Sequence, residues 1–339
     1  MQLKFLSLAL LAEYGYAQVG RMPMLRFSCS QLVVERLDPL VNPGMNPSPH
    51  VHQIVGGNSF NASMDPATHD LPSSSTCTSC TFSEDFSNYW TAVLYFRARN
   101  GTYRRVPQYA SEGLTADGGI TIYYIASPDA SVNVTAFTPG FRMLVGDAAA
   151  TSPGSAPKVC HRCMPATGDN QNLNCAAPDS QTLPTGFCEG GIRSVITFPT
   201  CWDGKNTDSA DHMSHIAYPN PDASHNGVGA EGTCPSSHPV RIPQVMYEVM
   251  WDTRPFNDKN LWPEDGSQPF VHGYSQHGDY VFGWKDDSLQ RAMDLRCDGD
   301  VCSGLARQSP EEAMKCTKQR VVDEDIDGWF TEIPGMTMT

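Results

Sequence analysis

The chain alternates apolar and polar side chains with a period of two in several short stretches, which Pro, Gly and Asn residues separate. Between residues 244 and 252, for example, Val245, Tyr247 and Val249 alternate with residues of the opposite face. Successive side chains of an extended strand point to opposite faces, so this pattern predicts a β-strand. Further strands are predicted, on similar patterns or on β-branched and aromatic composition, at residues 89–96, 120–125, 141–145 and 192–198.

Only one stretch has helical spacing. Asp287 and Ser288 are residue types that cap helices, and Leu289 and Met293 follow with a spacing of four, as far as Arg296. Strands without intervening helices imply antiparallel pairing. We therefore predict a mainly β fold, an antiparallel β-sandwich or jelly-roll-like single domain with long disulfide-stapled loops and one short helix.

The N-terminal residues have the composition of a secretory signal. Lys4 precedes a short apolar run, and Gly15 and Ala17 are small residues at a suitable distance for cleavage. No later segment has the ~20 apolar residues that a membrane-spanning helix needs, so we expect no transmembrane segment. We expect a signal peptide at residues 1–17, a single secreted β-rich domain at residues 18–302, and a C-terminal extension, loosely packed, at residues 303–339.

The chain contains 12 cysteines, an even number that indicates disulfides in an exported protein. Two Cys-x-x-Cys pairs, which begin at Cys77 and Cys160, have zinc-ribbon spacing, but thiols in an oxidising compartment form disulfides instead. Cys297 and Cys302 are expected to close a local loop. The other pairings stay open, because spacing alone does not fix them.

The net charge and the glycosylation sequons indicate which partners and which compartment to expect. The formal net charge is −14, which would repel nucleic acid and anionic membranes, so we expect no nucleic-acid partner. Asn61, Asn100 and Asn133 each begin an Asn-x-Ser/Thr sequon, which suits a glycosylated exterior. We expect a secreted protein, extracellular or associated with the cell wall.

Histidine and carboxylate residues gather in three stretches of the chain. His50 and His52 stand two apart, so both side chains project from one face if the segment is extended. Imidazole is the commonest metal ligand and a near-neutral acid or base. We therefore expect either a proton relay or a divalent metal, with His50, His52 and His212 as metal ligands. The alternative is a solvated strand edge.

The second stretch holds Asp203 and Asp211. We expect the apolar ring of Trp202 to raise the pKa of Asp203, as a general acid requires. The competing interpretation is that Asp208 and Ser209 cap a short helix. The third stretch is His277-Gly278-Asp279. The candidate catalytic residues of the second and third stretches are Asp203, Asp211, His215, His277 and Asp279.

Five residues are candidates for substrate binding: Trp202, Lys205, Asn206, His238 and Glu248. His238 is held between Cys234 and Pro239, which suits a preorganised site or a structural turn. Glu248 lies on a mostly apolar strand and needs a partner, for which Arg241 is a candidate.

These motifs resemble a fungal secreted family of unknown function whose members are sometimes joined to WSC cell-surface modules. The resemblance spans roughly residues 25–295 and implies a fungal, exported, single-domain protein, without supplying an activity. This chain departs from the family pattern at Phe282 and Lys285, which puts a ligand role after Asp279 in doubt. The motifs that carry the resemblance are Asp38-Pro39-Leu40-Val41-Asn42-Pro43-Gly44, Pro49-His50-Val51-His52, Gly56-Gly57-Asn58-Ser59-Phe60, Ser87-Asn88-Tyr89-Trp90, Gly140-Phe141-Arg142-Met143, Cys201-Trp202-Asp203-Gly204-Lys205-Asn206, Asp211-His212-Met213-Ser214-His215, Cys234-Pro235 with His238-Pro239-Val240-Arg241, and His277-Gly278-Asp279.

Three functional hypotheses follow from these residues. The first is a hydrolase that acts on extracellular or cell-wall glycans with a His/Asp cleft, as a glycoside hydrolase or a metal-assisted hydrolase. The second is a non-catalytic surface protein that binds carbohydrate or metal. The third is a buried polar network that only holds loops together. All three require His52, Asp203, His215 and Asp279 to meet on folding in a single pocket that solvent can reach.

Overall fold

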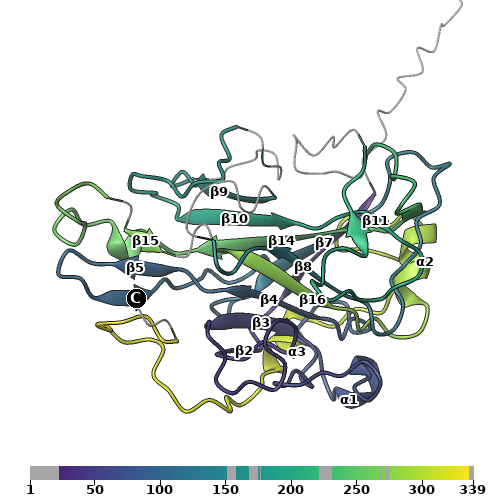
Figure 1. Ribbon diagram of the computed structural model, residues 1–339, viewed down its shortest axis with the longest axis horizontal. Helices are drawn as coiled ribbons and strands as arrows, with labels where there is room; N and C mark the ends of the chain where they lie inside the picture. The colour runs from purple at the N-terminus through teal and green to yellow at the C-terminus, as the bar shows by residue number, and fades with distance from the viewer. Residues whose placement is uncertain are drawn as a thin grey trace, which may run out of the picture.

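The computed structural model describes residues 23–150, 158–167, 175, 177–220, 231–267, 269–271 and 275–335. The predicted signal peptide, residues 1–17, lies outside the described residues. Two five-stranded antiparallel sheets make up the body (Figure 1). No helix in the described part of the chain has the length and apolar character needed to cross a membrane.

The first sheet has the strand order β1-β7-β14-β10-β9, and the second has the order β2-β3-β4-β16-β8. Strands of the first sheet are β1 (Met24–Cys29), β7 (Ile120–Ile125), β14 (Gln244–Trp251), β10 (Ile192–Thr197) and β9 (Val159–Cys163). Strands of the second sheet are β2 (Val33–Glu35), β3 (His52–Gly56), β4 (Asn88–Ala92), β16 (His277–Val281) and β8 (Arg142–Gly146).

The predicted mainly β, antiparallel fold is confirmed, and four predicted strands correspond to β7, β8, β10 and β14. The stretch 89–96 is two strands instead of one, because the chain changes sheet after Ala92. There β4 ends and β5 (Tyr95–Arg97) begins a small sheet with β6 (Tyr103–Arg105) and β15 (Phe270–Val271). A second small sheet contains β11 (Cys201–Trp202), β12 (Ile216–Ala217) and β13 (Val240–Arg241).

The helix predicted after Asp287 is α2 (Ser288–Asp294), but two other short helices were not predicted. These are α1 (Leu71–Ser74) and α3 (Pro310–Lys315), and a 3-10 turn spans Arg254–Phe256. Both helices are too short for a periodic apolar pattern. The sequence features that favour these helices are confined to their first turns. Asp70 and Ser309 each cap a helix with a side-chain oxygen, and each first turn contains a Pro.

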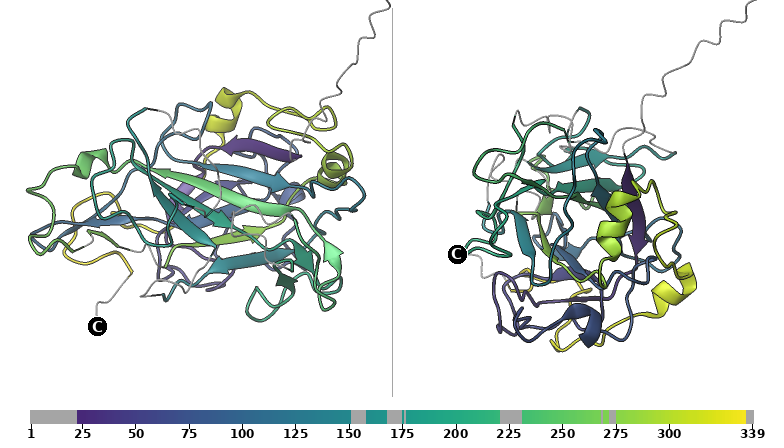
Figure 2. Two further views of the ribbon diagram at one scale, coloured as in Figure 1. Left: turned by 90° about the horizontal axis from the view of Figure 1, so that it is seen from above. Right: turned by 90° about the vertical axis from the view of Figure 1, so that its right-hand side faces the viewer.

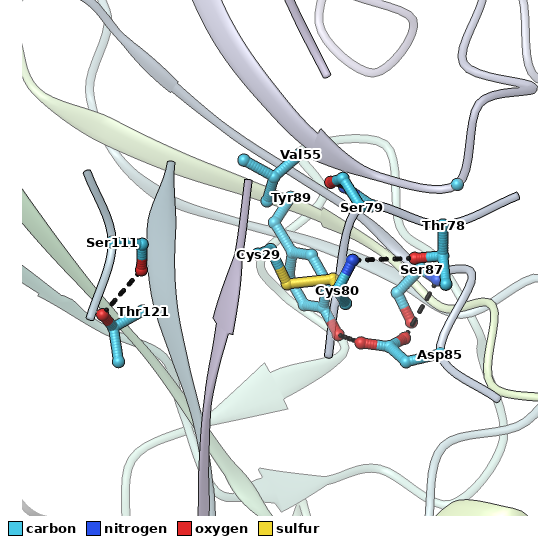
Figure 3. Close-up of a disulfide and its surroundings, with 12 residues drawn as sticks. Cys29, Val55, Thr78, Ser79, Cys80, Asp85, Ser87, Tyr89, Ser111 and Thr121 are labelled. Atoms are coloured by element: carbon cyan, nitrogen blue, oxygen red, sulfur yellow. Dashed lines mark hydrogen bonds between the residues drawn. A yellow bond between two sulfur atoms is a disulfide. The ribbon is translucent and has the colours of Figure 1, made fainter. Parts of the chain in front are cut away.

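The core between the two sheets is rich in tyrosine. The hydroxyl groups of Tyr89, Tyr124 and Tyr280 form a chain, with oxygen–oxygen distances of 2.8 and 2.9 Å. The chain ends on Asp85, which accepts a hydrogen bond of 2.6 Å from Tyr89 (Figure 3). Burial raises the pKa of Asp85 to about 7, despite the hydrogen bonds that favour its ionised form. These bonds satisfy polar groups inside an apolar core.

All 12 cysteines form disulfides, and Cys297–Cys302 closes the predicted local loop. No zinc ribbon forms, because each cysteine of the two Cys-x-x-Cys pairs bonds outside its own pair. The remaining disulfides are Cys29–Cys80, Cys77–Cys316, Cys160–Cys175, Cys163–Cys188 and Cys201–Cys234.

The C-terminal extension, which we expected to be loosely packed, is fastened to the body as far as residue 335. Cys316 is bonded to Cys77, and Glu324 pairs with Arg36 at 2.7 Å. Phe330 exchanges backbone hydrogen bonds with Tyr103. This part of the chain, yellow in Figure 2, runs along the outside of the sandwich. A disulfide and buried contacts therefore hold a segment whose sequence has little apolar periodicity.

Candidate metal centre

Strand pairing on the outer face of the second sheet brings two distant histidines together. His52 of β3 is paired with Ala92 of β4. On the other side of β4, Gly278 pairs with Thr91, which places His277 of β16 beside Ala92 in the same row. Because Ala92 carries only a methyl group, the two imidazole rings meet above it. Their Nε2 atoms are 3.1 Å apart.

His50 is the third member of the group. It precedes β3, and its ring centre lies 6.1 Å from that of His52 and 5.8 Å from that of His277. Each of the three rings offers one nitrogen, and these nitrogens all lie within 4.8 Å of one another. The predicted convergence of His50 and His52 is thus present, with His277 as their companion.

Hydrogen bonds to the backbone fix the tautomers of the two buried rings. His52 Nδ1 is 3.1 Å from the carbonyl oxygen of Leu37, and His277 Nδ1 is 2.8 Å from that of Ser275. A carbonyl oxygen only accepts, so each Nδ1 carries the hydrogen and donates it. In the neutral rings both Nε2 atoms are therefore lone-pair acceptors that face each other without a hydrogen between them.

Asp279 adds a carboxyl group to the same face. Its Oδ2 is 3.5 Å from His277 Nε2, and its side chain is fully buried. Neither carboxyl oxygen has a hydrogen-bond partner among the described residues. Burial, and then the negative charge of Asp38, raise the pKa of Asp279 well above its usual value. A buried carboxyl group in such surroundings is costly unless it is neutral or meets a cation.

The histidines of the centre favour the neutral form. Burial and the neighbouring His277 lower the pKa of His50 to about 4. Burial also lowers the pKa of His52 well below its usual value and lowers that of His277, although Ser275 and Asp38 act in the opposite direction on His277. Neutral imidazole is the form that coordinates metals.

One side of the centre is close to solvent. His50 is half-buried, whereas His52 and His277 are fully buried. A small hollow reaches His50 between the sheet and the C-terminal segment. Its lining residues are His50, Val51, Ala92, Val93, Tyr95, Ile333 and Pro334.

The Asp203–His215 stretch forms a separate cluster in which polar groups satisfy one another. Asp203 accepts hydrogen bonds from the backbone of Lys205 and Asn206 at 2.8 and 2.9 Å. Asp211 accepts them from Met213 and Ser214 at 3.1 and 2.8 Å. Each carboxylate thus closes a turn, and no helix begins at Asp208 or Ser209.

The pKa values of these two aspartates are low. Burial raises the pKa of Asp203, but the hydrogen bonds from Asn206 and Lys205 outweigh this effect and the net shift is downward. The backbone N–H of Ser214 is the largest cause of the strongly lowered pKa of Asp211. The expectation that Trp202 would raise the pKa of Asp203 is therefore wrong, because backbone donors favour the ionised form. The indole N–H of Trp202 instead donates to the carbonyl oxygen of Asn206 at 2.6 Å.

His212 and His215 also have partners inside this cluster. His212 Nδ1 lies 2.6 Å from Asp208, and the His212 carbonyl accepts from Leu144 at the edge strand β8. Since β4, β16 and β8 follow β3 in the sheet and His212 lies on the far side of β8, His212 is about four strand spacings, or ~19 Å, from His52. His215 is buried and donates through Nε2 to the carbonyl of Arg142 at 2.9 Å.

The other predicted binding residues lie apart from the histidine group. His238 Nε2 donates to the Ser214 carbonyl at 3.0 Å and so braces the Asp211–His215 turn. Lys205 is exposed in the turn after Asp203. Glu248 is on β14 of the first sheet, where its carboxylate accepts a hydrogen bond of 2.6 Å from the hydroxyl group of Tyr123. Its expected partner Arg241 donates to Thr200 and Gly232 instead.

The structure brings His50, His52, His277 and Asp279 together, but Asp203, Asp211 and His215 belong to the separate loop cluster. The expectation of one pocket that contains His52, Asp203, His215 and Asp279 is therefore wrong, because the loop is attached to the far edge of the sheet at β8.

Sequence reasoning did not assign Asp38 or Ala92 to the histidine group. Asp38 is almost fully buried and fixed by the backbone N–H groups of Leu40 and Val41. Asp38 begins one of the runs that carry the family resemblance, but nothing in the sequence placed it near the histidines. Ala92 owes its importance to strand register, which the sequence does not show.

In one further group of potential metal ligands, a disulfide removes the two thiols. Cys29, Cys80 and Asp85 lie close together, but the two sulfur atoms form a disulfide (Figure 3). A disulfide has no thiolate to offer a metal. Among the described residues this leaves the three histidines as the group of potential metal ligands that no covalent bond joins.

The chain belongs to the family described as a domain of unknown function, DUF1996, whose model matches residues 38–284. The match includes all members of the histidine centre, from Asp38 to Asp279. No curated protein and no solved structure matches the chain.

Proposed function

We propose that this protein binds a divalent transition-metal ion through His50, His52 and His277, with Asp279 as a neighbouring or fourth ligand. The observation that carries the proposal is the 3.1 Å distance between two Nε2 atoms whose rings each direct Nδ1 at a backbone carbonyl. An ion bound to both nitrogens would form metal–imidazole bonds of about 2.0–2.1 Å. With the two nitrogens 3.1 Å apart, the nitrogen–metal–nitrogen angle would be about 100°, which lies between the octahedral and tetrahedral values.

The surroundings of the rings support a metal site. Metal-binding histidines commonly donate their second N–H to a backbone carbonyl or a carboxylate, which orients the ring. Leu37 and Ser275 supply such carbonyls for His52 and His277. The ring orientations would then need no rearrangement when an ion binds.

The donor set favours particular ions. Three imidazoles and one carboxyl group suit Zn²⁺ or Cu²⁺, whereas Ca²⁺ and Mg²⁺ prefer oxygen ligands. With no free thiolate in the chain, a thiolate-selective ion has no matching site.

The proposed setting is a fungal protein exported to the cell surface or surroundings. Six disulfides support an oxidising compartment. The three sequon asparagines, Asn61, Asn100 and Asn133, are exposed, as glycosylation requires.

Metal stoichiometry tests the proposal directly. The full chain is stripped with a chelator, loaded with Zn²⁺ or Cu²⁺, desalted and analysed by elemental mass spectrometry. We expect one ion per chain, and a loss of roughly 100-fold or more in affinity in His52→Ala, because a lost ligand costs more than a lost outer hydrogen bond. Ala92→Leu keeps every ligand but places bulk between the rings, and should also weaken binding.

His212→Ala is the matched control, since it removes a histidine of the other cluster. It should retain one ion per chain. The proposal fails if the unaltered protein takes up no ion. That result is expected if the His52 and His277 rings share a proton instead of a metal. It also fails if His52→Ala binds as tightly as the parent.

A metal-assisted hydrolase that acts on cell-wall glycans is the second candidate. Three imidazole ligands leave a fourth position, as in catalytic zinc sites, and Asp279 lies beside His277. A bound ion would supply Lewis acidity there. Asp203 and Asp211 suit a general-acid role less well, because their pKa values are lowered.

A panel of fungal and plant polysaccharides separates catalysis from binding alone. Release of sugar that requires the metal and disappears in Asp279→Asn supports the hydrolase. If metal-loaded protein releases nothing from the whole panel, the role is binding without turnover.

A further inference from the structure

Strands β5 and β15 lie at one end of the molecule (Figure 1). A groove beside β5 shares no lining residue with the metal centre. Its volume is about 480 Å³, within the range of ligand sites. Three chain segments build it: the β5–β6 turn, the loop around residue 261, and the C-terminal segment. Its walls include Ala98, Asn100, Thr102, Asn260, Leu261 and Trp329.

Hydrogen bonds join the chain segments that build the groove. Arg99 donates to the carbonyl oxygens of Trp262 and Lys259 and pairs with Glu264, which ties the loop to the β5–β6 turn. Across the groove, Phe330 is paired with Tyr103 through two backbone hydrogen bonds of 2.8 Å. The site therefore exists before any ligand arrives.

Trp329 presents an aromatic surface to this groove. Its side chain is 44% exposed, although the C-terminal segment around it is anchored. The guanidinium of Arg104 lies over the ring at 5.7 Å, and the ring contacts Phe96 and Phe256. A fixed, half-exposed indole is a suitable surface for the apolar face of a sugar.

Asn100 lines the same groove and is the first residue of the sequon Asn100-Gly101-Thr102. Its Oδ1 accepts hydrogen bonds from the backbone and the hydroxyl of Thr102 at 3.1 and 2.8 Å. The amide oxygen is thereby fixed, which directs Nδ2, the atom that would bear a glycan, away from Thr102. Gly101 has φ +83°, a conformation that glycine adopts without strain at this turn.

We propose that Asn100 carries an N-linked glycan whose first N-acetylglucosamine residues dock in this groove against Trp329. The inference rests on the export in the proposed function and is independent of the metal centre. Asn61 and Asn133 are also exposed sequons, but neither lines this groove. They serve as internal controls for an undocked glycan.

The attachment is an ordinary transfer from a lipid-linked diphosphate oligosaccharide. A bond forms between Asn100 Nδ2 and C1 of the first sugar, and the bond between C1 and the diphosphate oxygen breaks. The lipid diphosphate leaves with the bonding electrons, and one amide proton passes to a base of the transferase.

Glycopeptide mass spectrometry of the full chain from a eukaryotic secretory host tests occupancy and docking together. We expect Asn100 to be occupied. Amidase treatment of the folded protein should release its glycan about tenfold more slowly than those of occupied Asn61 or Asn133, the factor that ~1.4 kcal/mol of stacking gives. Denatured protein should show no such difference.

Trp329→Ala should remove this protection, and Trp329→Phe, which keeps an aromatic ring, should retain part of it. Metal stoichiometry should not change in either variant, so failure here is distinct from failure of the metal proposal. The proposal is overturned if Asn100 is unoccupied, or if its glycan is released at the same rate with and without Trp329. Tight binding of added polysaccharide to the groove of glycosylated protein would also overturn it, by assigning the groove to an external ligand.

Discussion

Two His/Asp clusters lie near the second sheet, and they differ in what their polar atoms still need. In the Asp203–His215 loop, the aspartates accept backbone hydrogen bonds and His215 donates to a carbonyl. In the centre around His52 and His277, two imidazole nitrogens lie 3.1 Å apart and a buried carboxyl group has no hydrogen-bond partner among the described residues.

The hydrogen-bonding state of the polar groups distinguishes a structural cluster from a candidate binding site. Both regions have histidine and aspartate at short spacing, so composition alone ranks them as equals. A satisfied cluster stabilises a loop, because breaking it would leave buried groups unpaired. A cluster with an unpartnered buried carboxyl group beside paired imidazole nitrogens instead supports our proposal of a ligand that supplies positive charge.

The largest expected effect is on metal-linked stability. An ion that binds only the folded chain should raise the free energy of unfolding by about 4 kcal/mol at a free concentration 1,000 times its Kd. Calorimetry with and without Zn²⁺ or Cu²⁺ measures this. The increase should vanish in His277→Ala and in the milder His50→Ala, where the altered residue is half-buried. An unchanged increase in both variants would place the ion elsewhere.

A smaller effect is expected from His215→Ala in the loop. This change removes a buried ring packed against Phe141 and leaves the Arg142 carbonyl without its donor. We expect a loss of about 3 kcal/mol in the free energy of unfolding, measured by denaturant titration. Metal stoichiometry should remain one per chain. Loss of metal without loss of stability would reverse the roles assigned to the two clusters.

The smallest effect is a pH dependence of the loop. Because the pKa of Asp211 is lowered in the folded state, its stabilising contribution is present above the unfolded pKa of about 3.9 and is lost as the pH falls. In Asp211→Asn this acid-dependent part should disappear, while at pH 7 the change should be about 1 kcal/mol or less. Unfolding midpoints between pH 7 and pH 3 would show it. A variant with the same acid slope as the parent would argue against this role of Asp211.

The fold was largely predictable because period-two alternation and β-rich composition report local strand structure. Both β14 and β7 fall where the pattern placed them. The break between β4 and β5 was not predictable, since a change of sheet depends on which partners the strand finds. In the C-terminal extension, the disulfide from Cys316 to Cys77 replaces the periodic apolar contacts that sequence reasoning looks for.

The site was predictable in part. His50, His52, His277 and Asp279 were recognised as chemical candidates, because histidine and carboxylate at short spacing are informative. His212 was grouped with them on residue type, and only the strand order places it beyond β8. The low pKa of Asp203 could not be foreseen from Trp202, since backbone donors outweigh the apolar neighbour.

The sequence by itself indicated the strands β7, β8, β10 and β14, because period-two alternation and β-rich composition are properties of neighbouring positions. It also contained the even cysteine count and the residue types available for chemistry. Only the tertiary structure decided which of those residues meet. His52 and His277 are 225 positions apart. They converge because antiparallel register sets both beside Ala92, whose methyl group leaves room for two rings.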